Sequence, residues 1–388
     1  MSKHPLRGST AIVGVGLAGI GEAKGRSHLE LMGESIHKAL SDCGLGLGDV
    51  DGLWTVNMDN FLPSLTVTDY LGIRPKHVDG PNVGGASFLV HAISAASALH
   101  TGLCDVALIC YGSNQRTGAG GFVSKSDPPQ WEAPYKPRLP VTAYALAAAR
   151  HMHQYGTTRE QLAAVAVAAR QWAQKNPLAF MRDPLTIEDV LKSRMIVDPL
   201  TVRDCCLATD GAGAVVMVRA DRAKSLKKKP AYFLGGAAAQ WYRGISGMSG
   251  DITVTSASDS GPRAFAMAGL KPSDVDVLEL YDAFTINTIL FLEDLGFCPK
   301  GEGGRFVADG NIGPGGKTPV NTNGGGLSCV HPGMYGIFTL IEATEQIRGE
   351  GGERQEPGVN VALAHGNGGT LSSQVTDLLG SESTLNPH

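Results

Sequence analysis

Residues 44–53 read "GLGLGDVDGL", and residues 269–278 read "GLKPSDVDVL". Both stretches follow an amphipathic helical pattern, "LELMGESIHKALSDC" in the first case and "GPRAFAMA" in the second, and both lead into an apolar strand. The offset of 225 residues between them is too long for a solenoid repeat. A duplicated domain therefore explains the match.

The similarity extends beyond these two stretches. Residues 93–112, "ISAASALHTGLCDVALICYG", align with residues 340–368, and each segment contains a helix, a glycine and a strand with the core Val-Ala-Leu. In this alignment Cys110 of the first half corresponds to His365 of the second. Each half follows the order strand, helix, strand, helix, strand, which is typical of a mostly parallel sheet covered by helices. We predict an α/β fold with five stacked layers.

A segment of different composition separates the two halves. Residues 113–200 are rich in Pro, Arg, Lys, Trp and Tyr, as in "SDPPQWEAPYKPRLP", before the pattern becomes helical. We interpret this segment as a loop domain inserted into the first half, where it covers a site. The predicted domains are residues 1–112 with 201–228, the inserted residues 113–200, and residues 229–388.

The composition excludes several classes of protein. With 388 residues, 43% of them hydrophobic, we expect two packed units with a sizeable core. The net charge of -4 offers no electrostatic footprint for nucleic acid or an anionic membrane, and no apolar run is long enough to span a bilayer. The N-terminus shows no secretory signal, and the seven scattered cysteines contain no CxxC pair. We expect a cytoplasmic protein with reduced thiols and no metal site.

Three motifs have a structural interpretation. The "GVGLAG" glycines (14–19) fit a dinucleotide-binding pattern, but no helix begins directly at them, so we expect a structural turn before a helix capped by Ser27. The two histidines of "HMH" (151–153) diverge on a helix, which favours a solvated helix face over a metal site. We expect the adjacent Cys205 and Cys206 to pack in the core.

Three further stretches lie at the carboxyl ends of predicted strands, where α/β sheets bind ligands. They are "PNVGGASFLV" (81–90), "ELYDAFT" (279–285) and "NTNGGGLSCVHPGMYG" (321–336), with "HGNGG" (365–369) following the last. Glycines before a helix leave backbone N–H groups free to bind an oxyanion or a thioester oxygen. The candidates for this role are Gly84, Gly325, Gly326 and Gly368.

Polar side chains at the same strand ends suit acid–base chemistry. Tyr281, His331 and His365 form one such set. For His331 taken alone, a structural role is equally consistent with the residues around it. The remaining site candidates are Asn323, Cys329, Gly85 and Ser87.

These motifs, together with "AIVGVG", "DCCLATDGAGAVV" and "GFCPKGEGGRFVADG", resemble the thiolase superfamily over nearly the whole chain. The closest resemblance is to the sterol-carrier-protein thiolase, or lipid-transfer-protein, branch. It implies the thiolase fold, which is a five-layered α-β-α-β-α arrangement of two duplicated halves with an inserted loop domain.

Thiolases of this family act on CoA thioesters through a nucleophilic cysteine, a histidine in a His-Pro-Gly turn, a second cysteine, and an Asn or His that begins the "xDAF" motif. In this chain His331 keeps the family position in the turn. Gly85 stands at the nucleophile position, His365 at the second cysteine, and Tyr281 at the start of "xDAF". Ser87, two residues beyond Gly85, would be a nucleophile only with a base in reach, and a backbone-bonding role is more common for such a serine.

One branch of the family matches this pattern. Thiolase-like aldolases of side-chain degradation lack the nucleophilic cysteine, carry Tyr in "YD.FT", and cleave β-hydroxyacyl-CoA by retro-aldol chemistry. The resemblance implies Tyr281 as the acid or base and His331 as a polarising donor. Those aldolases have a tyrosine two residues before the histidine of the turn, where this chain has Cys329.

The leading hypothesis is therefore an enzyme that makes or breaks a C–C bond next to a CoA thioester without a cysteine acyl-enzyme. One alternative is an acyl-CoA acetyltransferase in which Cys329, Cys110 or Ser87 carries the acyl group, and another is a non-catalytic acyl-CoA-binding subunit. The resemblance implies a homodimer and a small partner with a zinc ribbon and an oligonucleotide/oligosaccharide-binding fold, and no tightly bound cofactor. Candidate cations for the CoA phosphates are Lys125, Lys136, Arg138 and Arg182.

Overall fold

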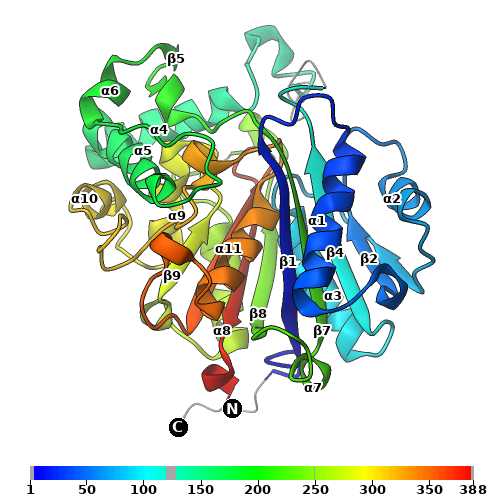
Figure 1. The fold of residues 1–388 in the computed structure, drawn as a ribbon. Coiled ribbons are helices and arrows are strands. Elements are labelled where there is room, and N and C mark those ends of the chain that lie inside the picture. Colours follow the sequence, from blue (N-terminus) through cyan, green and yellow to red (C-terminus); the bar gives the residue numbers. More distant parts are fainter. Residues whose placement is uncertain (1–3, 119–127, 249, 386–388) are drawn as a thin grey trace.

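The computed structural model describes residues 4–118, 128–248 and 250–385. The main strands in these ranges are β1 (Thr10–Gly21), β2 (Gly52–Thr55), β3 (His77–Asp79), β4 (Val106–Ser113), β7 (Asp210–Arg219), β8 (Ala231–Gln240), β9 (Val277–Leu280), β10 (Val361–Gly368) and β11 (Ser373–Gly380). Within the described residues they form one nine-stranded sheet in the order β3-β2-β4-β7-β1-β8-β11-β10-β9 (Figure 1).

The sheet order confirms the duplication. The run β2-β4-β7-β1 of the first half is mirrored by β9-β10-β11-β8 of the second. The halves meet at β1 and β8, which pair antiparallel where Ala11 faces Tyr232 and Ile12 faces Ala231. The parallel pairs β2–β4 and β9–β10 occupy equivalent places, so each half contains the same strand–helix–strand unit.

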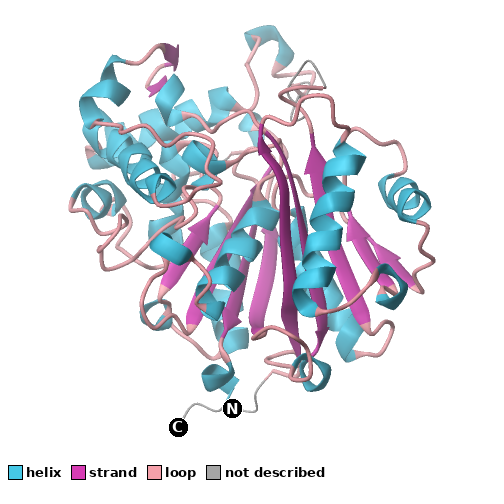
Figure 2. Ribbon diagram, viewed as in Figure 1, coloured by secondary structure: helices cyan, strands magenta, loops and turns pink. Residues whose placement is uncertain are grey.

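The helices complete the five layers. The helices that cover most of the sheet are α1 (His28–Cys43), α3 (Ser87–His100), α8 (Ala257–Ala268) and α11 (Gly336–Arg348). Helix α1 packs on β1, β4 and β7, and α8 packs on β8 and β11, so these two helices form the outer layers (Figures 1 and 2). Helices α3 and α11 contact each other and strands of both halves, so they form the central layer. The predicted fold class is confirmed.

The repeated stretch makes the same local turn in both halves. The Asp49 carboxylate accepts the backbone N–H of Gly46 at 2.9 Å, and the Asp274 carboxylate accepts that of Lys271 at 2.8 Å. In each case the carboxylate occupies backbone donors of a tight turn between a helix and the next strand. This first aspartate of the "DVD" motif therefore fixes the connection.

The second aspartate of the motif joins two strands. Asp51 accepts two backbone N–H groups at the start of β4, both at 2.8 Å. Asp276 accepts two at the start of β10, at 2.7 and 2.9 Å. The residue just before β2 or β9 is thus tied to the strand that pairs with it, which sets the parallel register.

The "GVGLAG" glycines lie within β1, so the predicted turn is wrong. Strand β1 passes so close under α1 that a Cβ added at Gly14 or Gly16 would overlap the helix backbone. These glycines therefore permit helix-on-sheet packing. The expected cap of α1 is confirmed, because the Ser27 hydroxyl accepts the Glu30 N–H while the Glu30 carboxylate accepts the Ser27 N–H.

The segment between β4 and β7, which we call the insertion (residues 114–209), is largely helical in its described part. Its elements include α4 (Val141–Tyr155), α5 (Arg159–Gln174), α6 (Ile187–Lys192), β5 (Met195–Val197) and β6 (Leu200–Thr201). Helix α5 packs against α9 (Thr285–Asp294), α10 (Gly303–Ala308) and the 325–329 turn of the second half. The insertion thus lies beside the strand ends that carry the candidate residues.

The "HMH" pair diverges as expected, with one histidine exposed and the other buried. His153 is exposed, but His151 is fully buried and its Nε2 lies 3.0 Å from a carboxylate oxygen of Glu293 on α9. The prediction of a solvated helix face is therefore wrong for His151, which joins the insertion to the second half. No helix among the described residues has the length and apolar character needed to cross a membrane.

Candidate active site

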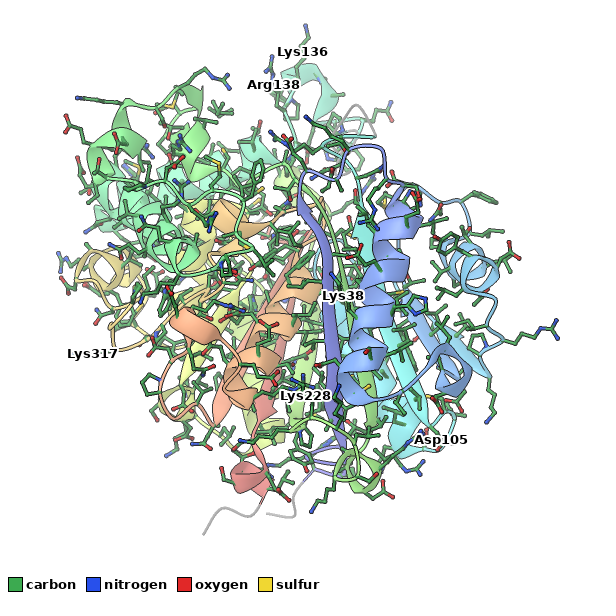
Figure 3. All side chains as sticks on the ribbon, in the orientation of Figure 1. Lys38, Asp105, Lys136, Arg138, Lys228 and Lys317 are labelled. Atoms are coloured by element: carbon green, nitrogen blue, oxygen red, sulfur yellow. The ribbon has the colours of Figure 1, made fainter. Side chains whose placement is uncertain are left out.

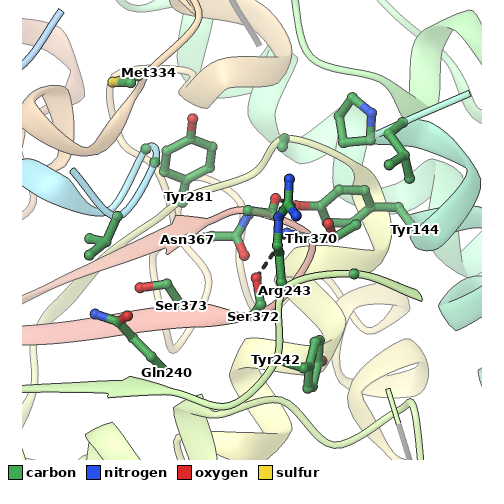
Figure 4. A pocket seen from close by; sticks show the side chains of 18 of the residues that line it. Tyr144, Gln240, Tyr242, Arg243, Tyr281, Met334, Asn367, Thr370, Ser372 and Ser373 are labelled. Atoms are coloured by element: carbon green, nitrogen blue, oxygen red, sulfur yellow. Dashed lines mark hydrogen bonds between the residues drawn. The ribbon is translucent and has the colours of Figure 1, made fainter. Parts of the chain in front are cut away.

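A cavity of about 910 Å³ opens at the strand ends named above (Figure 4). Its walls come from the turn before α3, helix α4 of the insertion, the segment after β8, the residues after β9 and the β10–β11 connection. The residues that the chemistry concerns are Gly84, Gly85, Tyr144, Tyr281 and His331. One cavity therefore collects residues from both halves and from the insertion.

Tyr281 and His331 form a hydrogen-bonded pair in this cavity. The Tyr281 Oη lies 3.1 Å from the His331 Nε2, and the rings meet edge to face with centroids 5.5 Å apart. The backbone N–H of Tyr335 also donates to the Tyr281 Oη, at 3.1 Å. Since that donor uses one lone pair of the phenol oxygen, the Tyr281 hydroxyl proton is free to point at the imidazole.

Both members of the pair are uncharged near neutral pH. Burial raises the pKa of Tyr281 well above its usual value. Burial lowers the pKa of His331 to about 4, so its imidazole carries a single N–H. The pair can therefore pass a proton between oxygen and nitrogen without a permanent charge in the cavity.

Gly85 and Tyr281 are sterically complementary. A Cβ added at Gly85 would overlap the ring and the hydroxyl of Tyr281. The phenol thus fills the space into which a side chain at residue 85 would project. The two departures from the thiolase pattern at these positions are one coupled structural change.

The backbone of His331 is held from both sides. The Gln115 side-chain amide donates to the His331 carbonyl oxygen at 2.8 Å, and the His331 N–H donates to the Thr209 hydroxyl at 3.0 Å. Gln115 belongs to the insertion and Thr209 immediately precedes β7. Both residues lie within the insertion, which therefore positions a histidine of the second half.

Asp282, the residue after Tyr281, anchors the turn that leads to His331. Its buried carboxylate accepts the N–H of Gly326 at 2.6 Å and that of Leu327 at 3.3 Å. Burial raises the pKa of this carboxyl to about 7, against the hydrogen bonds from Gly326 and Leu327. Sequence reasoning did not single out this residue, although alternation along the strand end directs it away from Tyr281.

The predicted glycine donors are mostly engaged elsewhere. The Gly325 N–H donates to the Asn323 side-chain oxygen at 2.7 Å, and the Gly326 N–H donates to Asp282. Neither glycine lines the cavity, nor does Gly368, whereas Gly84 does. The structure therefore contradicts a thioester-binding role for the Gly325 and Gly326 amides.

Asn323 and Cys329 lie on the far side of the 325–329 turn, in a smaller cavity that contains neither Tyr281 nor His331. This turn is a wide helical one, closed by the Val330 N–H and the Gly325 carbonyl at 3.2 Å. Cys329 and His331 therefore face different cavities, although only one residue separates them in the chain. Burial also raises the pKa of the Cys329 thiol.

Ser87 supports the turn before α3. Its hydroxyl donates to the Gly84 carbonyl at 2.6 Å and accepts the Val83 N–H at 2.9 Å. The side chain is fully buried and does not line the cavity. This is the backbone-bonding arrangement that competes with a nucleophilic role.

His365 also lies behind the cavity wall. Its Nδ1 is 2.9 Å from the Thr376 hydroxyl and its Nε2 is 2.9 Å from the Gln374 side-chain oxygen. Burial lowers the pKa of His365 to about 3, so the ring is neutral. Gln374 donates to Asn367 at 2.7 Å, and Asn367 donates to the Tyr144 hydroxyl at 2.7 Å. His365 therefore reaches the cavity only through two other side chains.

Several cavity residues were missed by sequence reasoning. Cys205 and Cys206 pack against the hydrophobic core as predicted, but Cys206 also lines the cavity, and burial raises the pKa of its thiol. Tyr144 lies on α4, outside the "HMH" motif of that helix, and belongs to no motif itself. The wall after β8 includes Gln240 and Arg243, and the rule that ligands bind at the carboxyl ends of strands could have found it.

The candidate cations lie around the entrance or outside it. Lys136 and Arg138 are exposed on the insertion, at the top of the molecule in Figure 3, and Arg243 lines the cavity. In the part of the chain that the structure describes, none of these three is paired with a carboxylate. Arg182 is exposed and does not line the cavity, and Lys125 lies outside the described residues.

Known proteins resemble this chain over its whole length. A family described as "Thiolase C-terminal domain-like" matches residues 237–381. A steroid side-chain-cleaving aldolase of Thermomonospora curvata is 36% identical over 380 residues, covering 94% of this chain and 96% of the relative. The chain belongs to the thiolase superfamily.

Two further relatives refine its place among the thiolases. An acetyl-CoA acetyltransferase of Methanothermobacter thermautotrophicus is 36% identical over 371 residues, covering 93% of this chain and 96% of the relative. A solved structure described as an Ltp2-ChsH2(DUF35) aldolase shares 34% identity and a TM-score of 0.89, covering 98% of this thiolase-like chain and all of the other. The predicted lipid-transfer branch is confirmed, and the protein is an enzyme of a superfamily that acts on CoA esters.

Proposed function

We propose that this thiolase-superfamily enzyme cleaves β-hydroxyacyl-CoA by a retro-aldol reaction, without an acyl-enzyme. The observation that carries the proposal is the Tyr281 phenol, which fills the space beside Gly85 and is hydrogen-bonded to His331. The aldolase relatives described above support the same reaction type.

The chemistry needs only this pair and the thioester. The β-hydroxyl gives its proton to the Tyr281 Oη while the Tyr281 proton moves to the His331 Nε2. The Cα–Cβ bond then breaks, Cβ becomes the carbonyl carbon of an aldehyde or ketone, and the electron pair forms the thioester enolate. The proton returns through Tyr281 to Cα, which releases the shorter acyl-CoA. Because the thioester bond stays intact, no free CoA is consumed.

The relay suits the protonation states of the pair. A free tyrosinate would be disfavoured in this site, since burial raises the pKa of Tyr281. In the coupled transfer, Tyr281 gains one proton as it loses another, so it remains neutral. The positive charge forms on His331 only while the negative enolate forms beside it.

Assembly and location are further parts of the proposal. The edge strand β3 carries Val78, which is 45% exposed, and this apolar side chain on an unpaired edge supports pairing of two copies through it. The Ltp2-ChsH2(DUF35) relative supports a second protein as a partner, for which we propose the zinc-ribbon and oligonucleotide/oligosaccharide-binding type. All seven cysteines are free thiols, which supports a reducing, cytoplasmic location.

The test is product analysis with a panel of 3-hydroxyacyl-CoA esters and no free CoA. Aldehyde plus a shorter acyl-CoA is expected, and Tyr281→Phe should lower kcat/KM by about 10²- to 10⁴-fold. Because the pKa of His331 is lowered to about 4, the rate should not fall between pH 8 and pH 6, where an ordinary histidine would become protonated. Tyr144→Phe is the matched control, since it removes a phenol hydroxyl from another wall of the same cavity.

A different outcome would identify the alternatives. CoA-dependent thiolysis of β-ketoacyl-CoA, with an acetyl adduct on Cys329, Cys110 or Ser87, would establish an acetyltransferase and overturn the proposal. Inactivity with and without the partner, combined with binding of CoA esters, would establish a non-catalytic subunit.

A further inference from the structure

One wall of the cavity ends in two polar side chains that lie next to each other. Ser373 at the start of β11 pairs in register with Gln240 at the end of β8, and both line the cavity. Ser373 is only 6% exposed, yet among the described residues its hydroxyl has no hydrogen-bond partner. The Gln240 side-chain amide is likewise without a hydrogen bond to the described residues.

The neighbouring polar groups are already satisfied. The Ser372 hydroxyl accepts the Thr370 N–H at 3.1 Å, the dashed line in Figure 4, and donates to the Gly368 carbonyl at 3.3 Å. The Asn367 amide is bonded at both ends, to Gln374 and to Tyr144. Two adjacent serines of one wall thus differ, since the Ser372 hydroxyl bonds to its own turn and the Ser373 hydroxyl bonds to none of the described residues.

A buried hydroxyl without a partner is unfavourable, and such groups in native proteins meet a ligand or a water molecule. The Ser373 and Gln240 side chains are themselves uncharged and present both donors and acceptors, from a hydroxyl and an amide. That combination matches a neutral oxygen, either a hydroxyl or a keto group.

We propose that Ser373 and Gln240 form a subsite for an oxygen atom on the acyl group, separate from the β-hydroxyl that is cleaved. The preferred substrates are then acyl-CoA esters with an oxygenated chain or ring, rather than plain alkyl esters. Figure 4 is consistent with this placement of the acyl group. Gln240 and Ser373 lie on one side of the cavity, below Tyr281, and Tyr144 of the insertion lies on the opposite side. This inference deepens the proposed function and rests on it for the acyl group's place in the cavity.

The first experiment compares 3-hydroxyoctanoyl-CoA with analogues that carry a second hydroxyl or a keto group at successive carbons from C5 to C8. We expect the best analogue to be cleaved with a kcat/KM about 10-fold above that of the parent ester. Ser373→Ala and Gln240→Leu should each reduce this ratio to about 2-fold or less. Ser372→Ala is the matched control, because it weakens the turn and lowers Tm but should keep the ratio.

A second experiment separates this inference from the proposed function. Calorimetry gives the Kd of octanoyl-CoA and of its hydroxy and keto analogues, which lack the β-hydroxyl and are not cleaved. If no 3-hydroxy ester is cleaved, the retro-aldol proposal fails, and the ratio of Kd values still decides the subsite. The proposed subsite would be overturned if, for the wild type, the ratios of kcat/KM and of Kd between each analogue and its parent ester were all near one. It would also be overturned if Ser373→Ala left these ratios unchanged.

Discussion

The turns that lead into β2 and β9 make the same hydrogen bonds, whereas β4 and β10 carry unlike side chains at their fifth residues, Cys110 and His365. Asp51 and Asp276 each bind two backbone N–H groups of the neighbouring strand. At the equivalent positions further along, Cys110 is a buried thiol whose pKa burial raises to about 12, and His365 is a buried imidazole with two polar partners. Side chains that bind backbone are retained because both halves need the same connection, while side chains facing the interior have diverged.

The starts of the central helices α3 and α11, one from each half, contact each other directly. Gly85 lies just before α3 and Gly336 begins α11, and the Gly336 N–H donates to the Gly85 carbonyl at 3.1 Å. A Cβ at Gly336 would overlap that carbonyl, as a Cβ at Gly85 would overlap Tyr281. Each helix start is therefore limited to glycine by a different neighbour, although the two occupy equivalent places.

The largest effect is expected from a side chain at the first of these helix starts. Gly85→Ala should push the Tyr281 ring away from His331 and lower kcat/KM by about 10²-fold or more. The free energy of unfolding should fall by about 1–3 kcal/mol, because the site is overpacked. Steady-state kinetics and urea unfolding measure the two effects.

The control for Gly85→Ala is Gly48→Ala, since a Cβ at Gly48 meets no atom within 4 Å. The double variant Gly85→Ala with Tyr281→Ala should recover stability without recovering activity. Wild-type activity in Gly85→Ala would contradict the steric exclusion between these positions.

Truncation to alanine should destabilise the protein unequally at the two equivalent positions, Cys110 on β4 and His365 on β10. His365→Ala leaves the Gln374 side-chain oxygen unpaired, removes one of the two partners of the Thr376 hydroxyl, and should lower the free energy of unfolding by about 3 kcal/mol. Cys110→Ala removes only a buried thiol and should cost about 1 kcal/mol. If urea unfolding gave equal losses of free energy for the two variants, the hydrogen bonds of His365 would contribute no more to stability than the packing of the Cys110 thiol.

The turns, by contrast, should respond alike. Asp51→Asn and Asp276→Asn should each lower the free energy of unfolding at pH 7 by about 1 kcal/mol, since each weakens two hydrogen bonds to a carboxylate. A difference of more than about 2 kcal/mol between the variants would break the equivalence of the two turns.

Acid should remove the contribution of Asp51. Burial acts to raise the pKa of Asp51, but the Val106 and Asp105 N–H groups and Lys76 outweigh it and hold the pKa below its usual value. A carboxyl with a lowered folded-state pKa stabilises the protein fully above its unfolded pKa of about 3.9 and loses that contribution as the pH falls through the folded pKa. The gap between wild type and Asp51→Asn should therefore close as the pH falls below about 4.

The smallest effect is expected at Cys329, which resembles Cys110 in being buried outside the main cavity. Cys329→Ala should change kcat/KM by about 2-fold or less, and iodoacetamide should not alkylate Cys329, because this thiol is buried and its pKa is raised. Rapid inactivation that Cys329→Ala abolishes would show that the thiol takes part in the reaction.

Much of the fold was predictable because its signals are local. The "DVD" repeat, the Val-Ala-Leu strand cores and the strand–helix order all lie within short windows of sequence, and each corresponds to bonds described above. The order of strands in the sheet was less accessible, since β7 returns to the first half only after the whole insertion.

The candidate site was predictable only where a motif marks a strand end. Tyr281 and His331 were found in this way. Their contact could not be predicted from the sequence, because 50 residues separate them. Cys329 was misplaced because a glycine-rich stretch can form a wide helical turn as readily as an extended strand. Tyr144, Gln240 and Ser373 carry no motif, and only the folded chain brings them to the cavity.

The overlap between residue 85 and the Tyr281 ring also restricts how such a site can arise. A side chain at residue 85 and a tyrosine at residue 281 exclude each other, so no ancestor held both a nucleophile at 85 and this phenol. The change to glycine must have come first or together with the tyrosine, because glycine at 85 is compatible with a small residue at 281 and the reverse order is not. If the two changes were separate steps, the intermediate had glycine at residue 85 and a small residue at 281, and it possessed neither catalytic group.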